Sequence, residues 1–387
     1  MNKKLGYYTV NGIEFESKIH ACLYVTKNNL PESALQWHFN DFEFNSFDWT
    51  VEPMETLDEL YNARARQLRE SYDYIILSYS GGADSHNALM SFLRQGLHVD
   101  ELLINTFDEA LKNVRVDPAN KAATTAPQLE HHLQTIPRLK EIAAMSPKTK
   151  ITILDMSNHL FNFHDYYKDE SWVLTRKEGL NPLNVTRFNY IYIDQVRKQF
   201  DKTKSIAIVA GVEKPRIAVR SDDVMYTYFN DKSANISSIA DNTKEYANAT
   251  VELFYWAPES LKMICKQVHT VKNLIEFNPT YRSFFKGSTF HTVRLIIEPF
   301  LRSVLYPTTW NNDWYQGEKA LSDWFSEFDY WFIFGQKGTK AHDLWYSGVK
   351  YIGENAGSFV KRDEAGRAIG TKPIFKYYKI GSLNIRN

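Results

Sequence analysis

Short apolar runs alternate with helical patterns through the middle of the chain. The apolar runs predict strands over residues 74–79, 101–106, 150–156 and 205–210. Between them, the spacing of apolar positions predicts helices over residues 84–95, 127–145 and 187–200. Runs that are apolar throughout are typical of parallel strands buried on both faces. Strands that alternate with helices therefore favour an α/β fold, with a doubly wound parallel sheet.

The first part of the chain follows a different pattern. Residues 7–15 predict a hairpin around an Asn-Gly pair, because Asn-Gly favours a type I′ turn. A short helix is expected over residues 17–27. Thr56 and Glu59 have the spacing of a capping box, which predicts the start of a longer helix. We therefore expect a separate N-terminal α+β segment at residues 1–70.

The alternation of strands and helices also stops after residue 215. The remaining chain predicts a hairpin at 216–229, a strand at 251–256, helices over 258–273, 291–305 and 317–334, and a final hairpin that pairs 359–361 with 374–378. Helices thus dominate the last third of the chain. The sequence predicts a doubly wound domain at residues 71–257 and a mainly helical C-terminal region at residues 258–387.

Charge balance and cysteine content exclude several classes of protein. The 387 residues include 46 basic and 46 acidic side chains, which argues against a surface dominated by nucleic-acid or membrane binding. Two cysteines, Cys22 and Cys265, cannot build a disulfide framework or a four-cysteine zinc site. No apolar stretch reaches the ~18 residues that cross a bilayer, and no signal-peptide core follows Met1. We expect a cytoplasmic protein without a membrane partner.

The segment from Ser80 to Ser85 joins the first predicted parallel strand to its helix. Its sequence, Ser-Gly-Gly-Ala-Asp-Ser, places backbone N–H groups at a helix N-terminus, where they have no intrahelical acceptor. The glycines let the backbone approach an anion closely, and the helix dipole adds positive charge. Asp84 suits such a site if Mg²⁺ screens it from the phosphates. The pattern predicts a loop that binds the phosphates of ATP, and a plain turn with Asp84 as helix cap is the alternative.

This segment resembles the SGGxDS signature of the PP-loop superfamily, the N-type ATP pyrophosphatases that include asparagine synthetase, GMP synthetase and tRNA-lysidine synthetase. The resemblance implies that ATP is cleaved to AMP and pyrophosphate to activate a carbonyl or carboxylate, which an amine or ammonia then attacks. It implies ATP contacts along the strand end and loop at Ser78, Ser80, Gly81, Gly82, Asp84 and Ser85. Asp84 would also be a catalytic residue and a ligand of Mg²⁺.

A second cluster of candidate residues follows the strand predicted at 205–210. Gly211 lets the chain turn there, while Lys214 and Arg216, two positions apart, would point to one side of an extended chain. Both could reach phosphate, so both are predicted catalytic residues. The resemblance adds Gly211 and Lys214 as ATP contacts, and Glu213 as a metal ligand or a residue that acts on the nucleophile. An ordinary charged surface turn is the alternative.

The resemblance also places the end of the second parallel strand against adenine. The residues there are Asn105, Thr106 and Phe107. Ligands of open α/β sheets bind beyond the carboxyl ends of the strands, which is where these residues and Ser80 would meet. Asp222 and Asp223 could supply another Mg²⁺ ligand, although adjacent Asp residues usually form a hairpin turn.

Absent motifs narrow the function but leave alternatives open. Residue 2 is Asn, so the cysteine nucleophile of a fused glutamine-hydrolysing domain is missing, and ammonia would come free or from a partner. One alternative is a PP-loop enzyme that modifies a nucleic-acid base and grips RNA or DNA with the basic, aromatic residues 372–379. Another is a non-catalytic nucleotide sensor, or a protein similar to phosphoadenosine phosphosulfate reductases. Tryptophans late in the chain suggest a homo-oligomer contact, and the acceptor substrate stays open.

Overall fold

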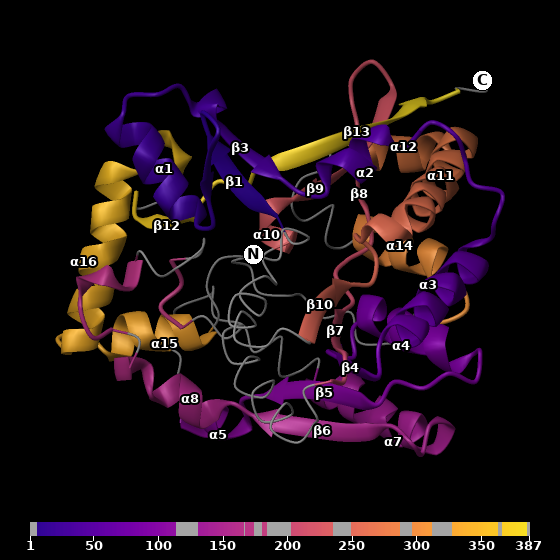
Figure 1. Ribbon diagram of the computed structural model, residues 1–387, viewed down its shortest axis with the longest axis horizontal. Coiled ribbons are helices and arrows are strands. Elements are labelled where there is room, and N and C mark those ends of the chain that lie inside the picture. Colours follow the sequence, from indigo (N-terminus) through magenta and orange to yellow (C-terminus); the bar gives the residue numbers. More distant parts are fainter. Residues whose placement is uncertain are drawn as a thin grey trace.

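Five parallel strands form the central sheet of the computed structural model (Figure 1). The structure describes residues 6–113, 131–165, 167–173, 180–183, 203–234, 249–286, 296–311, 327–362 and 366–384. The sheet has the order β10-β7-β4-β5-β6. Its strands are β4 (Tyr74–Ser78), β5 (Glu101–Thr106), β6 (Lys150–Asp155), β7 (Ile206–Ala210) and β10 (Ala249–Leu253). All neighbours are parallel, which confirms the α/β prediction at the level of a Rossmann-like sheet flanked by helices.

The sheet is one strand larger than the regular alternation predicts. The strand expected at 251–256 is β10, and it pairs in parallel with β7, from Ala249 opposite Ile206 to Leu253 opposite Ala210. The sequence predicts this strand within the domain at 71–257, but the regular alternation does not indicate its parallel pairing with β7. Its burial explains the pairing, because Val251 and Leu253 are both covered in the core.

Three of the helices beside the sheet lie where the sequence predicts helices, namely α3 (Leu57–Ser71), α4 (Ala83–Leu93) and α7 (Ile136–Met145). Two short helices, α5 (Asp108–Asn113) and α8 (Ser157–Phe161), were not predicted. The capping box predicted at Thr56 and Glu59 is present at the start of α3. α3 packs against α4, and α4 contacts β4. The helix predicted at 187–200 and the first residues of the one predicted at 127–145 lie outside the described residues.

The N-terminal segment forms a small antiparallel sheet. Its elements are β1 (Tyr7–Val10), β2 (Ile13–Phe15), α1 (Lys18–Lys27), β3 (Leu35–His38) and α2 (Asp41–Ser46). The predicted hairpin is confirmed, and both turn residues have positive φ, 48° at Asn11 and 82° at Gly12. Positive φ at both central positions is the property of the type I′ turn.

A second antiparallel sheet joins the middle of the chain to its end. The elements here are β8 (Arg216–Val219), β9 (Val224–Asn230), α10 (Asp231–Ala234) and β13 (Phe375–Ser382), with strand order β13-β9-β8. The hairpin of β8 and β9 is confirmed. The predicted final hairpin is wrong, because β11 (Val360–Arg362) pairs with β12 (Ala368–Thr371), while β13 pairs with β9.

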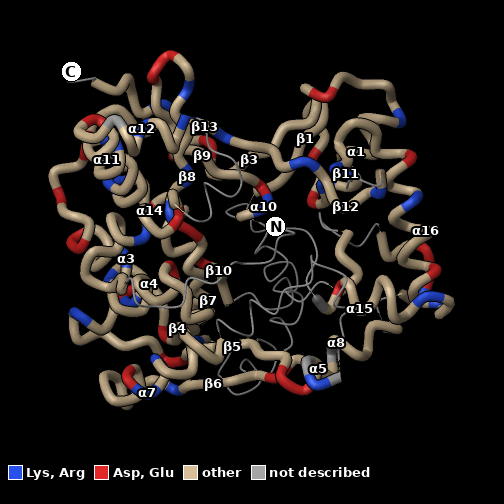
Figure 2. Tube along the Cα trace, turned by 180° about the vertical axis from the view of Figure 1, so that it is seen from behind, with Lys and Arg blue, Asp and Glu red and all other residues tan. Residues whose placement is uncertain are grey.

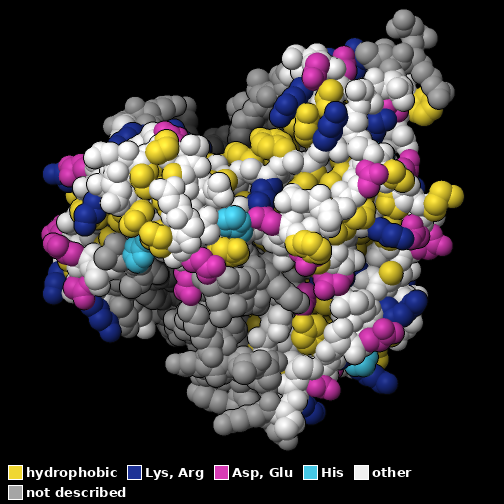
Figure 3. Space-filling model, turned by 45° about the horizontal axis from the view of Figure 1, so that its top comes forward, with side chains coloured by type: hydrophobic (Ala, Val, Ile, Leu, Met, Phe, Trp, Pro, Cys, Tyr) yellow, Lys and Arg dark blue, Asp and Glu magenta, His cyan; other side chains and the backbone are white. Residues whose placement is uncertain are grey.

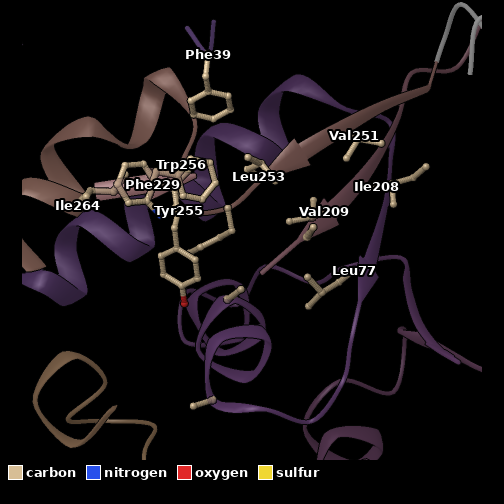
Figure 4. Packing of buried hydrophobic residues seen from close by; sticks show 14 of the residues in the cluster. Phe39, Leu77, Ile208, Val209, Phe229, Val251, Leu253, Tyr255, Trp256 and Ile264 are labelled. Atoms are coloured by element: carbon tan, nitrogen blue, oxygen red, sulfur yellow. The ribbon is translucent and has the colours of Figure 1, made fainter. Parts of the chain in front are cut away.

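Packing of aromatic rings accounts for the distant pairing of β13. Tyr378 of β13 is buried and stacks on Trp49, with ring centroids 4.8 Å apart. Trp256, just after β10, stacks on Phe229 of β9 at 4.4 Å, and Phe39 lies near the same pair (Figure 4). Buried aromatic area is large for each ring, so this cluster outweighs the local preference for an adjacent hairpin.

The C-terminal region is mainly helical, as its spacing predicts. Its helices are α11 (Leu261–Phe277), α12 (Pro279–Lys286), α14 (Glu298–Leu305), α15 (Glu327–Gly335) and α16 (Lys340–Asn355). α11 packs against α3 and α14, and α16 contacts α1 of the N-terminal segment. The three domain boundaries expected from the sequence stay a prediction.

The surface mixes charges and apolar side chains. Lys and Arg segments are interspersed with Asp and Glu segments along the trace (Figure 2). On the face shown in Figure 3, hydrophobic side chains form several small groups. None of the helices in the described ranges combines the length and apolar character that crossing a lipid bilayer requires.

A buried ion pair connects α1 of the N-terminal segment to α10, which follows β9. Lys18, the first residue of α1, and Asp231, the first residue of α10, have their Nζ and Oδ2 atoms 2.5 Å apart, and both side chains are at most 1% exposed. Tyr8 donates its hydroxyl to the same Oδ2 at 3.1 Å, and the Ile374 amide donates to Oδ1 at 2.9 Å. The carboxylate therefore holds three separate parts of the chain.

Loss of this ion pair should destabilise the fold. In Lys18→Met, Asp231 stays buried without its cation, and we expect the free energy of unfolding to fall by about 3–5 kcal/mol. The free energy of unfolding is measured by urea denaturation. The control Lys27→Met, at the exposed end of α1, should change it by less than about 0.5 kcal/mol. Equal effects of the two substitutions would contradict this role of Asp231.

Candidate functional site

The two candidate loops meet where the order of the central sheet reverses. From β4 the chain adds β5 and β6 on one side, then returns with β7 to the other side of β4. The loop after β4 holds Ser80 to Asp84, and the loop after β7 holds Gly211 to Lys214. Loops that leave adjacent strands in opposite directions open the crevice in which doubly wound sheets bind ligands. The fold therefore places both predicted clusters at one position.

Gly211 lets the loop after β7 pack closely against the first turn of α4. A Cβ atom at this residue would lie 2.8 Å from Ser85 Cα and 3.0 Å from Ser85 N. Any side chain there would push the end of β7 away from the first turn of α4. The residue is thus required for close packing of strand and helix, a role that glycine has in phosphate-binding turns.

The loop after β4 is closed by its own serines. The Ser85 hydroxyl donates to the Gly82 carbonyl at 3.1 Å and accepts from the Ser80 amide at 3.3 Å. Ser80 Oγ lies 3.2 Å from Ser85 Oγ and accepts from the Gly82 amide at the same distance. These bonds fix the turn, so the two hydroxyls shape the loop.

Four other amides of the loop face no protein acceptor in the described part of the chain. They are the N–H groups of Gly81, Ala83, Asp84 and Ser85, at the start of α4. Gly81 has φ of 76°, which turns its backbone into the left-handed region that glycine tolerates. Unsatisfied amides at the N-terminus of a helix attract anions, and phosphate is a common one.

Asp84 stands between a buried lysine and a buried tyrosine. Its Oδ1 accepts a hydrogen bond from the Tyr306 hydroxyl at 2.5 Å, and its Oδ2 lies 4.0 Å from Lys214 Nζ. The Tyr255 hydroxyl donates to the Asp84 carbonyl oxygen at 3.0 Å. Two hydroxyls and one ammonium thus fix the position of this residue. The predicted pair of Asp84 and Lys214 is brought together.

Lys214 is also bound by a carboxylate that the sequence did not indicate. Glu298, the first residue of α14, has its Oε2 2.6 Å from Lys214 Nζ. Burial lowers the pKa of the Lys214 ammonium, but the carboxylates of Asp84 and Glu298 raise it more, and the resulting pKa is above its ordinary value. Lys214 therefore carries a positive charge at neutral pH. Arg302, 3.9 Å from the same Oε2, balances the second carboxylate.

Glu213 and Arg216 form a pair of their own beside this cluster. Arg216 Nε donates to Glu213 Oε1 at 2.9 Å, and the Ser233 hydroxyl donates to the same oxygen at 2.9 Å. One carboxylate oxygen of the predicted metal ligand is thus already engaged. Of the two acidic residues predicted to bind Mg²⁺, Asp84 belongs to the first turn of α4, among the amides without an acceptor. No group of three or more His, Cys, Asp or Glu able to hold a metal occurs within the described ranges.

Residues from α7 and the turn before it cover one side of the loop. The Thr135 hydroxyl donates to the Ser80 carbonyl at 2.7 Å, and a Cβ at Gly81 would meet Thr135 Oγ1 at 2.4 Å. Arg138 is buried and donates from its guanidinium to the Gly81 carbonyl. A positive charge thus reaches the loop from a helix whose sequence has no phosphate-binding motif. Ser80 itself is exposed.

The residues predicted to contact adenine lie at the carboxyl end of β5. Asn105 is half-buried and Thr106 is buried, with the Thr106 carbonyl accepting from the Met156 amide at 2.9 Å. The Phe107 ring packs against Phe328 of α15, with centroids 5.2 Å apart. Ser78 ends β4, opposite Leu103 of β5 and Ala210 of β7. These positions are at the expected edge of the sheet, and their contact with adenine stays a prediction.

Sequence reasoning missed four residues of the site, namely Arg138, Tyr255, Glu298 and Tyr306. Three of them follow β7 in regions without any recognised motif, and Arg138 lies more than fifty residues from the loop along the chain. A single acidic residue at a helix start, such as Glu298, is normally read as helix capping. Only the packing of α7 and α14 brings these groups to the loop.

Comparisons with known proteins do not identify a family. No protein-family model matches the chain, and no curated protein matches it. The functional conclusion therefore depends on the geometry of the site and on the resemblance of its loop.

An alanine at Gly211 should loosen the contact between β7 and α4. We expect Gly211→Ala to lower the free energy of unfolding by about 1–3 kcal/mol, because its Cβ overlaps backbone atoms of Ser85. Thermal or urea unfolding measures the change. The control Gly335→Ala, whose Cβ would have its nearest neighbour at 3.7 Å, should be near neutral. A neutral Gly211→Ala would show that the strand and helix do not pack this closely.

Stability at acid pH should depend on His86. Burial, with the positive charges of Arg138 and Arg94, lowers the pKa of this histidine from 6.5 to about 3, so the folded state keeps it neutral. The unfolded state takes up a proton near pH 6.5. The stabilising effect of neutral His86 is therefore complete above pH 6.5 and is lost towards pH 3, at about 1.4 kcal/mol per pH unit.

The matching experiment compares His86→Gln with the exposed control His20→Gln. Urea denaturation between pH 7 and pH 4 gives the free energy of unfolding for both variants and for the unaltered protein. His86→Gln should flatten the pH dependence, while His20→Gln should leave it unchanged. If the free energy of unfolding of His86→Gln still falls with pH as in the unaltered protein, other groups cause the instability at acid pH.

Proposed function

We propose that this protein is an ATP-dependent adenylating enzyme of PP-loop type, which forms AMP and pyrophosphate to activate a carbonyl or carboxylate for attack by an amine or ammonia. The observation that carries the proposal is a set of backbone amides without an acceptor among the described residues, at Gly81, Ala83, Asp84 and Ser85. They lie at the switch point of a parallel sheet, where the Asp84 carboxylate meets the Lys214 ammonium. The sequence motif at Ser80 to Ser85 and the arrangement of these groups both support ATP as the ligand.

The residues of the site suit a phosphate chain. Backbone N–H groups at a helix N-terminus bind phosphate oxygens without specificity for the rest of the molecule. Lys214 and Arg138 add two buried positive charges, which act strongly where water is excluded. Bound ATP would supply a phosphorus atom that a substrate oxygen attacks, with pyrophosphate as the leaving group. Lys214, Arg138 and the amides would stabilise the charge on the departing phosphates.

Asp84 is the residue best placed to hold Mg²⁺ with ATP. Mg²⁺ is usually bound by one or two carboxylates together with phosphate oxygens and waters, so a preformed cage of protein ligands is not required. The Tyr306 hydroxyl fixes the Asp84 carboxylate, as hydrogen-bonded partners do for metal ligands in general. Glu213 is the less suitable ligand, because Arg216 and Ser233 already occupy one of its oxygens.

Substitution of Asp84 should strongly slow the turnover of ATP. We expect Asp84→Asn to lower the rate of pyrophosphate release by about 10²- to 10³-fold, since the charge that holds Mg²⁺ is lost while the Tyr306 hydrogen bond can persist. AMP and pyrophosphate are measured with Mg²⁺, ATP and a panel of carboxylic acids and amines. The matched control is Asp343→Asn on α16, whose side chain is 72% exposed, and it should leave the rate unchanged.

Calorimetry of ATP binding separates the ligand from the unknown acceptor. The unaltered protein should bind ATP with Mg²⁺, and the Lys214→Met variant should bind it at least about tenfold more weakly. ADP and phosphate as the only products would contradict the adenylating reaction. Absence of ATP binding by the folded protein would reject the proposal as a whole.

A further inference from the structure

The outer face of the β13-β9-β8 sheet is aromatic and basic. Side chains of the inner face, such as Met225, Phe229 and Tyr378, are buried in the core. Because successive residues of a strand point to opposite faces, the residues between them point outward. The outward set is Arg216 and Ala218 on β8, Val224, Tyr226 and Tyr228 on β9, and Phe375, Tyr377 and Lys379 on β13.

The strand register arranges these side chains in rows across the sheet. Tyr228 lies opposite Arg216 on one side and Tyr377 on the other. Tyr226 in the same way lies between Ala218 and Lys379. Directly opposed residues of antiparallel strands have neighbouring side chains. Each row therefore combines an aromatic ring with a basic group.

Three of the rings form one cluster, in which Tyr228 is half-buried and the other two are exposed. The ring centroids of Tyr228 and Tyr377 are 5.3 Å apart, those of Tyr228 and Phe375 are 5.7 Å apart, and those of Phe375 and Tyr377 are 6.0 Å apart. Tyr377 is 49% exposed and Phe375 is 39% exposed. Large rings at an antiparallel sheet face normally point into the core, so this much open aromatic surface indicates a binding role.

The charged groups on this face are all basic. Arg220, just beyond β8, lies over the Tyr226 ring at 4.2 Å from its centroid. Neither Arg220 nor Lys379 has a carboxylate partner among the described residues, and Arg216 is paired with Glu213. None of the outward positions named above on the three strands is acidic. The face therefore presents positive charge between stacked rings.

We infer that this face binds single-stranded nucleic acid. Aromatic rings on an open sheet stack on unpaired bases, and basic side chains beside them contact the phosphates that link those bases. A second copy of the same face fits less well, because a symmetric contact would bring its basic groups against one another.

The aromatic and basic face continues towards the candidate site, but nucleic-acid binding to this face does not require ATP. Arg216 belongs to the first row of the sheet and is bonded to Glu213, two residues after Gly211. A strand lying on the rings would therefore run towards the loop after β7. Nucleic-acid binding is expected with or without ATP, so it can be tested even if the adenylating reaction is absent.

Fluorescence anisotropy with labelled single-stranded oligo-uridine and oligo-thymidine tests the inference on the full-length chain. Tyr377→Ala and Phe375→Ala should each weaken binding by about fivefold or more, since one stacking platform is lost. Tyr351→Ala on α16 is the matched control, because this ring is 48% exposed and lies outside the face. Circular dichroism and urea unfolding show whether each variant keeps the fold.

The salt dependence gives a second readout that a change in folding would not imitate. Each phosphate contact contributes about 0.7 to the slope of log K against log salt concentration for single strands. Lys379→Gln should lower the slope by that amount, whereas Lys350→Gln, on α16 and exposed, should leave it unchanged.

Several results would overturn the inference. These are no binding of either oligonucleotide, preference for duplex over single strand, or equal affinity of Tyr377→Ala and Tyr351→Ala. If the protein self-associates in sedimentation experiments and Tyr377→Ala abolishes this, the face is a contact between copies of the chain instead.

The two oligonucleotides also distinguish the kind of nucleic acid. Binding to oligo-uridine alone would assign the face to RNA, and binding to oligo-thymidine as well would assign it to single strands in general.

Discussion

The close approach of Gly211 to the first turn of α4 determines how the rest of the site is built. β4 and β7 are neighbours in the sheet, so the loops after them start side by side, but they can come into contact only where one residue lacks a side chain. With Gly211 against Ser85, the amides of the α4 N-terminus and the Lys214 ammonium share one side of the sheet. A larger residue would separate the two loops that the proposed ATP site needs together.

The ion pairs of Lys214 then determine which ligands the candidate site can bind. Burying Lys214 is costly unless its charge is matched, and Asp84 and Glu298 both match it. Glu298 begins α14 and Tyr306 directly follows it, so residues of the C-terminal region reach the loops of the candidate site. The Asp84 carboxylate is held by one hydroxyl and faces one ammonium, an arrangement in which added Mg²⁺ and phosphate can exchange partners with Lys214.

Local patterns in the sequence predicted most of the central sheet and the residues of the two loops in the candidate site. Apolar runs located β4 to β7, and the Ser-Gly-Gly-Ala-Asp-Ser segment falls between β4 and α4 as its residue types require. Pairings between distant residues were not predictable in this way. β13 joins β9 because Tyr378 completes an aromatic cluster with Trp49, and Arg138 reaches the Gly81 carbonyl because α7 folds over the loop. Such contacts depend on packing, which hydrophobic spacing does not encode.

Hydrogen–deuterium exchange of the loop tests the central claim most directly. The amides of Gly81, Ala83, Asp84 and Ser85 have no acceptor among the described residues, so they should exchange quickly in the free protein. Saturating ATP with Mg²⁺ should slow exchange in the peptide that spans residues 79–86, because phosphate oxygens then accept from these amides. Unchanged exchange in this peptide, under conditions where calorimetry shows ATP bound, would contradict the account and place the nucleotide elsewhere on the protein.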